Sequence, residues 1–132
     1  IAFPWHGKAI EAMRGFLTSD TPKIGYNLKF ESRWIQRHLK MRVRNWVWDG
    51  MLAAHTIDCR PGITGLKFQA FALLGQESYD QEVSGFLQAD NANAPNRIRD
   101  VPLAKLLRYC AMDSLLEFKV AEIQAKQLGV KL

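Results

Sequence analysis

In the first half of the chain, segments with the hydrophobic spacing of a helix alternate with segments that have the pattern of a strand. Apolar side chains recur at helical spacing over residues 8–17, at Ile10, Met13, Phe16 and Leu17, and predict a first helix. Beyond it, apolar runs and cap signals predict a strand at 23–26, a helix at 28–39, a strand at 42–48 and a helix from Asp49 to Ile57. This order predicts parallel strands joined by right-handed crossovers.

The same pattern predicts which faces of these elements are buried. In the second strand, Val43 and Val47 are expected on one face, with an imperfect alternation around them. The inward positions of the second helix are Leu28, Trp34, Ile35 and Leu39.

The second half of the chain has a helical pattern. A turn at residues 59–62 precedes a short amphipathic helix at 66–74, which Gly75 ends. Residues 76–100 show little periodicity and include the polar run 90–96. A long helix begins near residues 100–102, where Pro102 suits the first turn, and continues to about residue 127. The sequence therefore predicts an α/β chain with a helical C-terminal half.

A phenol and a carboxylate share one face of this last helix. Tyr109 and Asp113 are four residues apart and stack on the same side. Leu106, Leu116 and Val120 fall on the same strip, so Asp113 occupies a position typical of the core. A buried carboxylate is costly unless it is paired, hydrogen-bonded or bound to a cation. The alternative is a partly exposed Asp at the edge of the stripe.

Four phrases in order resemble the 3′→5′ exonuclease domain of family A DNA polymerases, within the tyrosine-type acidic exonucleases that also include RNase D. YCAMD at 109–113 resembles the third motif, and KIGYNLKFESRW at 23–34, with Asn27 at the cap position and Glu31 four residues on, resembles the second. WDGMLAAH at 48–55 is similar to the family phrase WDTMLAA, and residues 65–75 to its GLK…LG stretch. The resemblance implies a ribonuclease H-like fold and covers roughly residues 4 to 125.

The chain departs from this family in two places. The second motif usually carries Asp where this chain has Glu31, whose side chain is one methylene longer. The first motif, a D-x-E on the first strand, is absent, and residues 1–6 read as the tail of the third strand. We therefore expect residues 1–132 to be a partial exonuclease domain without its N-terminal antiparallel strands, cut from a longer polypeptide that begins before Ile1.

The resemblance also implies a role for each candidate site residue. Asp113 would bind the metal that carries the nucleophilic water, and Tyr109 would hold that water in line. Glu31 would help to place the second metal through coordinated water. Asn27 would contact the 3′-terminal nucleotide, with Lys29 beside it as a further substrate contact. The implied cofactors are two Mg²⁺ or Mn²⁺ ions, which prefer hard oxygen ligands.

Each of these residues also has a structural explanation. Tyr109 could be a half-buried tyrosine with its hydroxyl at the surface, Glu31 a surface glutamate and Asn27 only a helix cap. The histidines, at positions 6, 38 and 55, show no metal-ligand spacing and are expected to be structural or superficial.

The composition of the chain restricts the class of protein but does not indicate a function. A chain of 132 residues with 48% hydrophobic content is sized for one globular domain. No apolar run is long enough to span a membrane, and no signal-peptide pattern is present, so no membrane partner is expected. Cys59 and Cys110 lie far apart without a metal-binding or disulfide pattern, and the default compartment is a reducing cytoplasm.

The net charge of +5 is compatible with a polyanionic partner. Much of the basic excess gathers in and just after the second predicted helix, at Arg33, Arg37, His38, Lys40, Arg42 and Arg44. This cluster is either a solvated helix face or a surface that contacts phosphates; salt-sensitive nucleic-acid binding would favour the second.

The expected function is proofreading-type 3′→5′ exonuclease activity on single-stranded DNA 3′ ends, in an intact parent that carries a polymerase domain or stands alone. This chain by itself is expected to be inactive. Two alternatives stay open: an RNase D-type 3′→5′ exoribonuclease, and a catalytically inactive module that binds single strands or packs between domains.

Overall fold

The computed structural model describes residues 2–89, 91 and 94–132. Its elements, in chain order, are α1 (Lys8–Thr18), β1 (Lys23–Gly25), α2 (Leu28–Leu39), β2 (Trp46–Asp49), α3 (Gly50–Ile57), α4 (Leu66–Leu74), α5 (Ser84–Leu87), the 3-10 turn η1 (Ile98–Asp100) and α6 (Leu103–Gln127). The mixed α/β order and the helical second half agree with the prediction, and the bounds of α2 are those expected from the pattern. No helix in these described ranges is long and apolar enough to cross a membrane.

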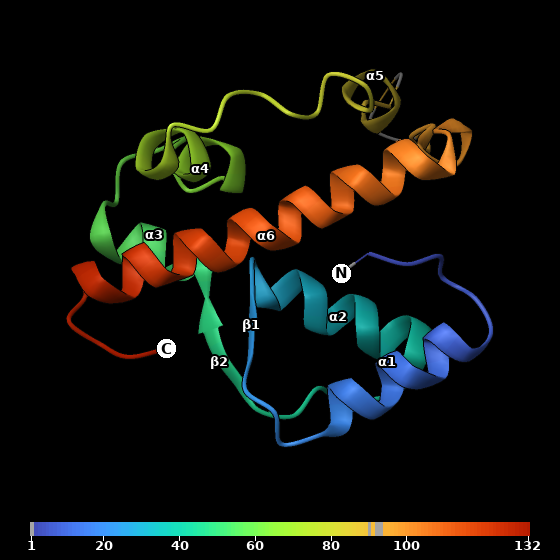
Figure 1. Cartoon of the computed structure of the whole chain (residues 1–132), viewed down its shortest axis with the longest axis horizontal. Helices are drawn as coiled ribbons and strands as arrows, with labels where there is room; N and C mark the ends of the chain where they lie inside the picture. Colours follow the sequence, from blue (N-terminus) through green and yellow to red (C-terminus); the bar gives the residue numbers. More distant parts are fainter. Residues whose placement is uncertain (1, 90, 92–93) are drawn as a thin grey trace.

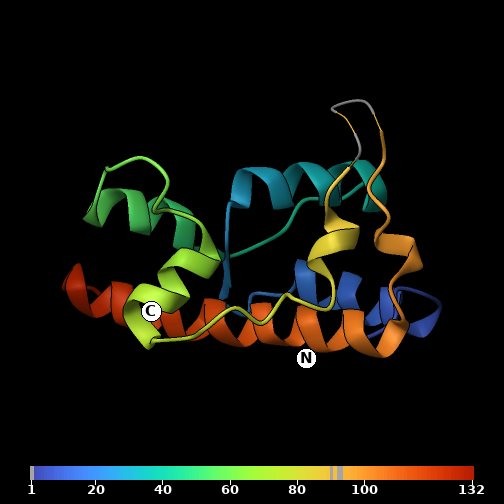
Figure 2. The same cartoon turned by 90° about the horizontal axis from the view of Figure 1, so that it is seen from above.

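The long helix α6 organises the molecule. In Figure 1 it crosses the ends of the two strands, with α1 and α2 on one side and α3 and α4 on the other. Figure 2, turned by 90°, shows the segment between α4 and α5 following the length of α6. Side chains along α6 therefore face both the strand region and the second-half helices.

The two strands described in the structure form a parallel pair, as predicted. Lys23 lies opposite Trp46, and Gly25 lies opposite Asp49, with an irregularity in register after Lys23. The crossover between the strands is α2. The carboxyl ends of β1 and β2 therefore lie together, next to the start of α2 and α3.

Two core clusters lie among the described residues, one centred in each half of the chain. The first is centred on Leu17, Ile35 and Leu39, which α1 and α2 supply. The second joins α4 to α6 and is made of Ala70, Leu116 and Val120, with partly buried side chains including Tyr79 and Met112 packed against it. Burial of Leu116 and Val120 confirms that the strip predicted on α6 faces inward.

One carboxylate joins the start of two helices. Asp49 caps α3, as predicted, by accepting hydrogen bonds from the backbone N–H groups of Met51 and Leu52 at 3.0 and 3.3 Å. It also accepts from the N–H groups of Asn27 and Leu28 at 3.0 and 2.9 Å. These four bonds satisfy donors that both helix N-termini would otherwise leave unpaired.

The prediction that Asn27 caps α2 is correct in position and wrong in mechanism. Asn27 occupies the cap position, but its side chain makes no capping hydrogen bond. Its backbone adopts the left-handed region, with φ 63° and ψ 57°, which Asn tolerates better than most residues. The acceptor comes instead from Asp49 at the end of β2, a contact between residues far apart in sequence.

Gln124 ties the long helix to the parallel pair. Its side chain is fully buried and donates to the Gly50 carbonyl at 3.0 Å and to Gln69 Oε1 at 3.3 Å. Its own oxygen accepts from Trp48 Nε1 at 3.3 Å. The absence of a side chain at Gly50 leaves room for the Tyr26 ring, since a Cβ there would lie 2.5 Å from that ring.

The second strand is shorter than predicted. It begins at Trp46 rather than at residue 42, because Asn45 has a left-handed backbone with φ 56° that interrupts the extended chain. Val43 therefore lies outside the strand and packs on the first core cluster, while Val47 is 43% exposed. The two valines do not share a buried face.

Two other expectations from the pattern, an inward Trp34 and a strand tail before α1, are wrong for the described residues. Trp34 is 38% exposed and packs edge-on against Trp5 at 5.6 Å between ring centroids, and Phe16 is also exposed. Residues 2–6 form no strand; Pro4 has no N–H for a ladder, and its carbonyl accepts from the His6 N–H in a turn. The irregular segment 76–100 contains the short elements α5 and η1, and positions 90, 92 and 93 of the predicted polar run lie outside the described residues.

Candidate active site

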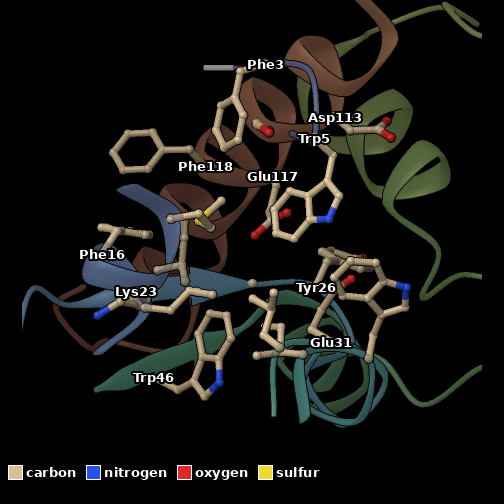
Figure 3. Close-up of a pocket in the computed structure, with 18 of the residues that line it drawn as sticks. Phe3, Trp5, Phe16, Lys23, Tyr26, Glu31, Trp46, Asp113, Glu117 and Phe118 are labelled. Atoms are coloured by element: carbon tan, nitrogen blue, oxygen red, sulfur yellow. The ribbon is translucent and has the colours of Figure 1, made fainter. Parts of the chain in front are cut away.

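A large pocket lies where α6 passes the first strand. Its volume is about 1020 Å³, and β1, α1, α2, α6 and the N-terminal segment line it. Most of its wall is apolar, with aromatic side chains such as Phe3, Trp5 and Trp46. Three carboxylate side chains also line it: Glu31 from α2, and Asp113 and Glu117 from α6. Figure 3 shows Asp113 and Glu31 at separate places on the wall, with Glu117 nearer the centre.

Two of the acids that the sequence singles out thus line the same pocket. Asp113 and Glu31 are 82 positions apart, by subtraction of their residue numbers, and reach the same pocket because α6 packs across the end of β1, from which α2 begins. Both side chains are half-buried. The simpler alternative, a plain surface glutamate at position 31, does not describe this position.

Two carboxyl groups in the pocket have raised pKa values. Burial raises the pKa of Glu31 above its usual range. Burial also raises the pKa of Glu117 to about 7, and the nearby charges of Glu31, Asp113 and Asp49 raise it further in the same direction. Like charges held this close repel one another, and a bound cation would relieve that repulsion.

Hard carboxylate oxygens on one pocket wall fit the ligand chemistry of Mg²⁺ or Mn²⁺. Within the described part of the chain, however, no group of three or more His, Cys, Asp or Glu side chains is close enough to hold an ion by itself. The acids of this chain thus fit a metal in type, and they supply an incomplete set of ligands.

Tyr109 lies beside Asp113 on the inner side of α6. Burial raises the pKa of the Tyr109 phenol well above its usual range, and the charge of Asp113 and a hydrogen bond to it act in the same direction. The hydroxyl is therefore protonated across the working pH range and remains available as a hydrogen-bond donor.

A second tyrosine, which sequence reasoning missed, contacts the same carboxylate. Tyr79 comes from the linker between α4 and α5, and its hydroxyl donates to Asp113 Oδ1 at 2.6 Å. Its ring stacks on that of Tyr109, with centroids 6.0 Å apart and planes 28° apart. Nothing in the sequence near residue 79 marks this contact, because it depends on how the linker follows α6.

Glu117 is the other residue that sequence reasoning missed. It follows Asp113 by four positions and therefore lies on the same strip of α6 as Tyr109 and Asp113. The spacing of these three residues was a usable signal, and applying the same face argument one turn further would have found the third acid.

Asn27 and Lys29 do not reach the large pocket. Asn27 lines a separate hollow of about 340 Å³ beside Asp49, His55 and Thr64. Lys29 is exposed on the first turn of α2. Their predicted contacts with substrate remain predictions.

Replacing Glu117 by Gln is expected to remove a pH-dependent loss of stability. The folded-state pKa of about 7 lies above the ordinary value of 4.5, so the folded protein binds more protons than the unfolded chain between these pH values. Stability therefore falls as pH rises through this window and stays low above it. As the pH rises from 4.5 to 8, the free energy of unfolding of the unsubstituted protein should drop by about 2 kcal/mol more than that of Glu117→Gln.

Urea unfolding of both proteins in EDTA, at pH 4.5, 6 and 8, measures this difference. Glu122→Gln removes an exposed carboxylate from the same helix and serves as the matched control. Parallel pH curves for the unsubstituted protein and Glu117→Gln would contradict the assignment of a raised pKa to Glu117.

Comparison with known proteins agrees with the geometry. A family profile described as 3′–5′ exonuclease, of the type found in family A DNA polymerases, matches residues 3–128. Searches of curated proteins and of solved structures each gave no match. Because the match spans nearly the whole chain, the protein belongs to the 3′–5′ exonuclease family of the DNA polymerase A and RNase D-like type.

Proposed function

We propose that this chain is part of an exonuclease domain with a ribonuclease H-like fold, and that the intact polypeptide hydrolyses single-stranded DNA from its 3′ end by two-metal catalysis. The observation that carries the proposal is that Asp113 and Glu31 line one pocket, from the two helices whose sequences resemble the family's second and third motifs. The family match over residues 3–128 supports the same assignment.

The chain's own residues would divide the work as follows. Asp113 would be a direct metal ligand, and Glu31, on another part of the pocket wall, would act through coordinated water. Tyr109 would donate its hydroxyl to the attacking water and hold it in line with the scissile bond. When bound, Mg²⁺ or Mn²⁺ would supply charge neutralisation and a more acidic water.

The first motif would complete this ligand set. Among the described residues β1 pairs with β2 alone, and every residue from Lys23 to Tyr26 lines the pocket. A strand carrying D-x-E beside β1 would bring two further carboxylates to the same pocket. We therefore propose that residues 1–132 form a partial domain that lacks this strand, and that the parent polypeptide supplies it.

Charge supports a nucleic-acid substrate. All six basic residues that the sequence pattern groups on and after α2 are exposed. One of them, Arg44, forms an ion pair with Asp20 at 2.8 Å. A solvated surface of this kind can contact phosphates in a salt-dependent way. In this proposal Asn27 and Lys29 contact the terminal nucleotide from the start of α2.

Matched oligonucleotides test the proposal. The intact polypeptide should shorten a 5′-labelled DNA strand from its 3′ end when Mg²⁺ is added, should stop when EDTA is added, and should cleave the RNA of the same sequence more slowly. Preference for the RNA strand would identify an RNase D-type exoribonuclease instead. Salt-sensitive binding of both strands without cleavage would identify an inactive binding module.

A further inference from the structure

A short linker holds a tyrosine against the central carboxylate of the proposed site. Tyr79 lies between α4 and α5, and its hydroxyl donates to Asp113 Oδ1 at 2.6 Å. The distance is in the range of a strong bond from a hydroxyl to a carboxylate. This bond is made to Oδ1, so Oδ2 is the carboxylate oxygen that Tyr79 does not contact.

The ring of Tyr79 is fixed independently of its hydroxyl. It packs against the core cluster of Ala70, Leu116 and Val120, and it stacks on Tyr109. The aromatic body thus sits in the apolar layer between α4 and α6, while the hydroxyl reaches the carboxylate. Removing the hydroxyl alone should leave this packing in place.

Polar contacts on both sides of Tyr79 anchor the linker backbone. Asp80 forms an ion pair with Lys67 of α4 and accepts from Ser78 Oγ, the latter at 2.7 Å. Lys67 Nζ in turn lies 5.5 Å from the centroid of the Tyr109 ring. The Asp80 carbonyl also accepts from the N–H groups of Val83 and Ser84 at the start of α5. The linker is therefore held to α4 and α5, and Tyr79 projects from it at a fixed place.

We propose that Tyr79 is a positioning residue for the exonuclease site, whose hydroxyl fixes the Asp113 carboxylate so that its other oxygen faces the metal. This inference rests on the proposed function and adds a residue to it. Ligating carboxylates are commonly held by such outer hydrogen bonds, and loss of one typically costs 10- to 100-fold in metal affinity or activity. Burial and the bond to Asp113 raise the pKa of the Tyr79 phenol well above its usual range, which keeps it a donor.

Tyr79→Phe in the intact polypeptide tests this role. We expect the dissociation constant for Mn²⁺, measured by calorimetry without DNA, and the Mn²⁺ concentration for half-maximal cleavage of single-stranded DNA each to rise about tenfold. At saturating Mn²⁺ the rate should return to within about threefold of the unsubstituted enzyme, because the carboxylate itself is still present. A residue that only stabilised the fold would lower the melting temperature and leave the metal requirement unchanged.

Ser78→Ala is the matched control, since it removes a hydroxyl-to-carboxylate bond from the same linker without touching Asp113. Its metal requirement should equal that of the unsubstituted enzyme. If the unsubstituted enzyme is active and Tyr79→Phe needs no more metal than it does, the positioning role of Tyr79 is overturned and the proposed function is not. An unsubstituted polypeptide without metal-dependent cleavage overturns the proposed function, and the role of Tyr79 with it.

Discussion

Replacing Asp113 by Ala in the intact polypeptide is expected to abolish 3′→5′ cleavage while the protein still folds. The substitution removes the proposed direct ligand and leaves charge unneutralised in the transition state, which costs on the order of 3 kcal/mol or more, a factor of at least about 10² in rate. The protein should remain folded, because Asp113 is half-buried in the middle of α6 and Ala suits a helix interior. The lost bond from Tyr79 is worth about 1–2 kcal/mol.

Tyr109→Phe separates the role of the phenol from that of the carboxylate. This change keeps the ring and its stacking on Tyr79 and removes the hydroxyl proposed to hold the water. The chemical step should slow, by about 10²-fold, while the affinity for a single strand stays nearly the same. A tyrosine needed only for packing would retain full activity as Phe.

Single-turnover cleavage of a labelled single strand, measured beside the melting temperature, distinguishes these cases. Glu122→Ala is the matched control, because it removes an exposed carboxylate from the same helix. An Asp113→Ala protein that cleaves at the parental rate would refute the assignment of the site to this pocket. A loss of thermal stability in proportion to the loss of cleavage would mark Asp113 as structural.

Local signals in the sequence predicted the helices well. The bounds of α2 and the end of α4 at Gly75 follow from apolar spacing and from a glycine whose backbone is left-handed, with φ 66°. These features depend on residues within one or two turns of each other. Asp49 as the cap of α3 is of the same kind.

The pattern failed where distant segments decide the local structure. The second strand starts late because Asn45 turns the chain, after the Arg44 N–H has bonded to the Leu17 carbonyl of α1 at 2.9 Å. Trp34 is partly exposed and packs against the rings of Trp5 and His38 rather than in the first core cluster. Neither partner could be assigned from periodicity alone.

In the candidate site, too, residues within a local motif could be predicted, and residues placed by distant segments could not. Asp113 and Glu31 could be named from motifs, since the family phrases carry them, and the structure places both on one pocket wall. Asn27 was named from the same phrase but lines a different hollow, where its backbone N–H donates to Asp49. Tyr79 could be identified only from the path of the linker along α6, which no local sequence pattern predicts.

Residues 1–132 alone are expected to hydrolyse no oligonucleotide at a useful rate. In the proposed site the missing D-x-E strand would supply two carboxylates, and each lost electrostatic stabiliser costs on the order of 3 kcal/mol. Two such losses together correspond to a reduction of about 10⁴-fold or more in rate. The acids present in this chain also leave the metal short of ligands, since the described residues hold no group of three that could bind it. Binding of Mg²⁺ or Mn²⁺ should accordingly be weak.

The purified chain, incubated in excess over a 5′-labelled DNA strand with Mn²⁺, measures this residual activity. Circular dichroism on the same sample shows whether α6 and the other helices are formed, so that inactivity is not confused with unfolding. The same chain with Asp113→Ala is the control for contaminating nuclease, because contamination is indifferent to that substitution. Robust cleavage by residues 1–132 that needs Mn²⁺ and disappears in the Asp113→Ala chain would mean that Asp113 works without a first motif, and the proposal of a partial domain completed by an upstream D-x-E strand would fall.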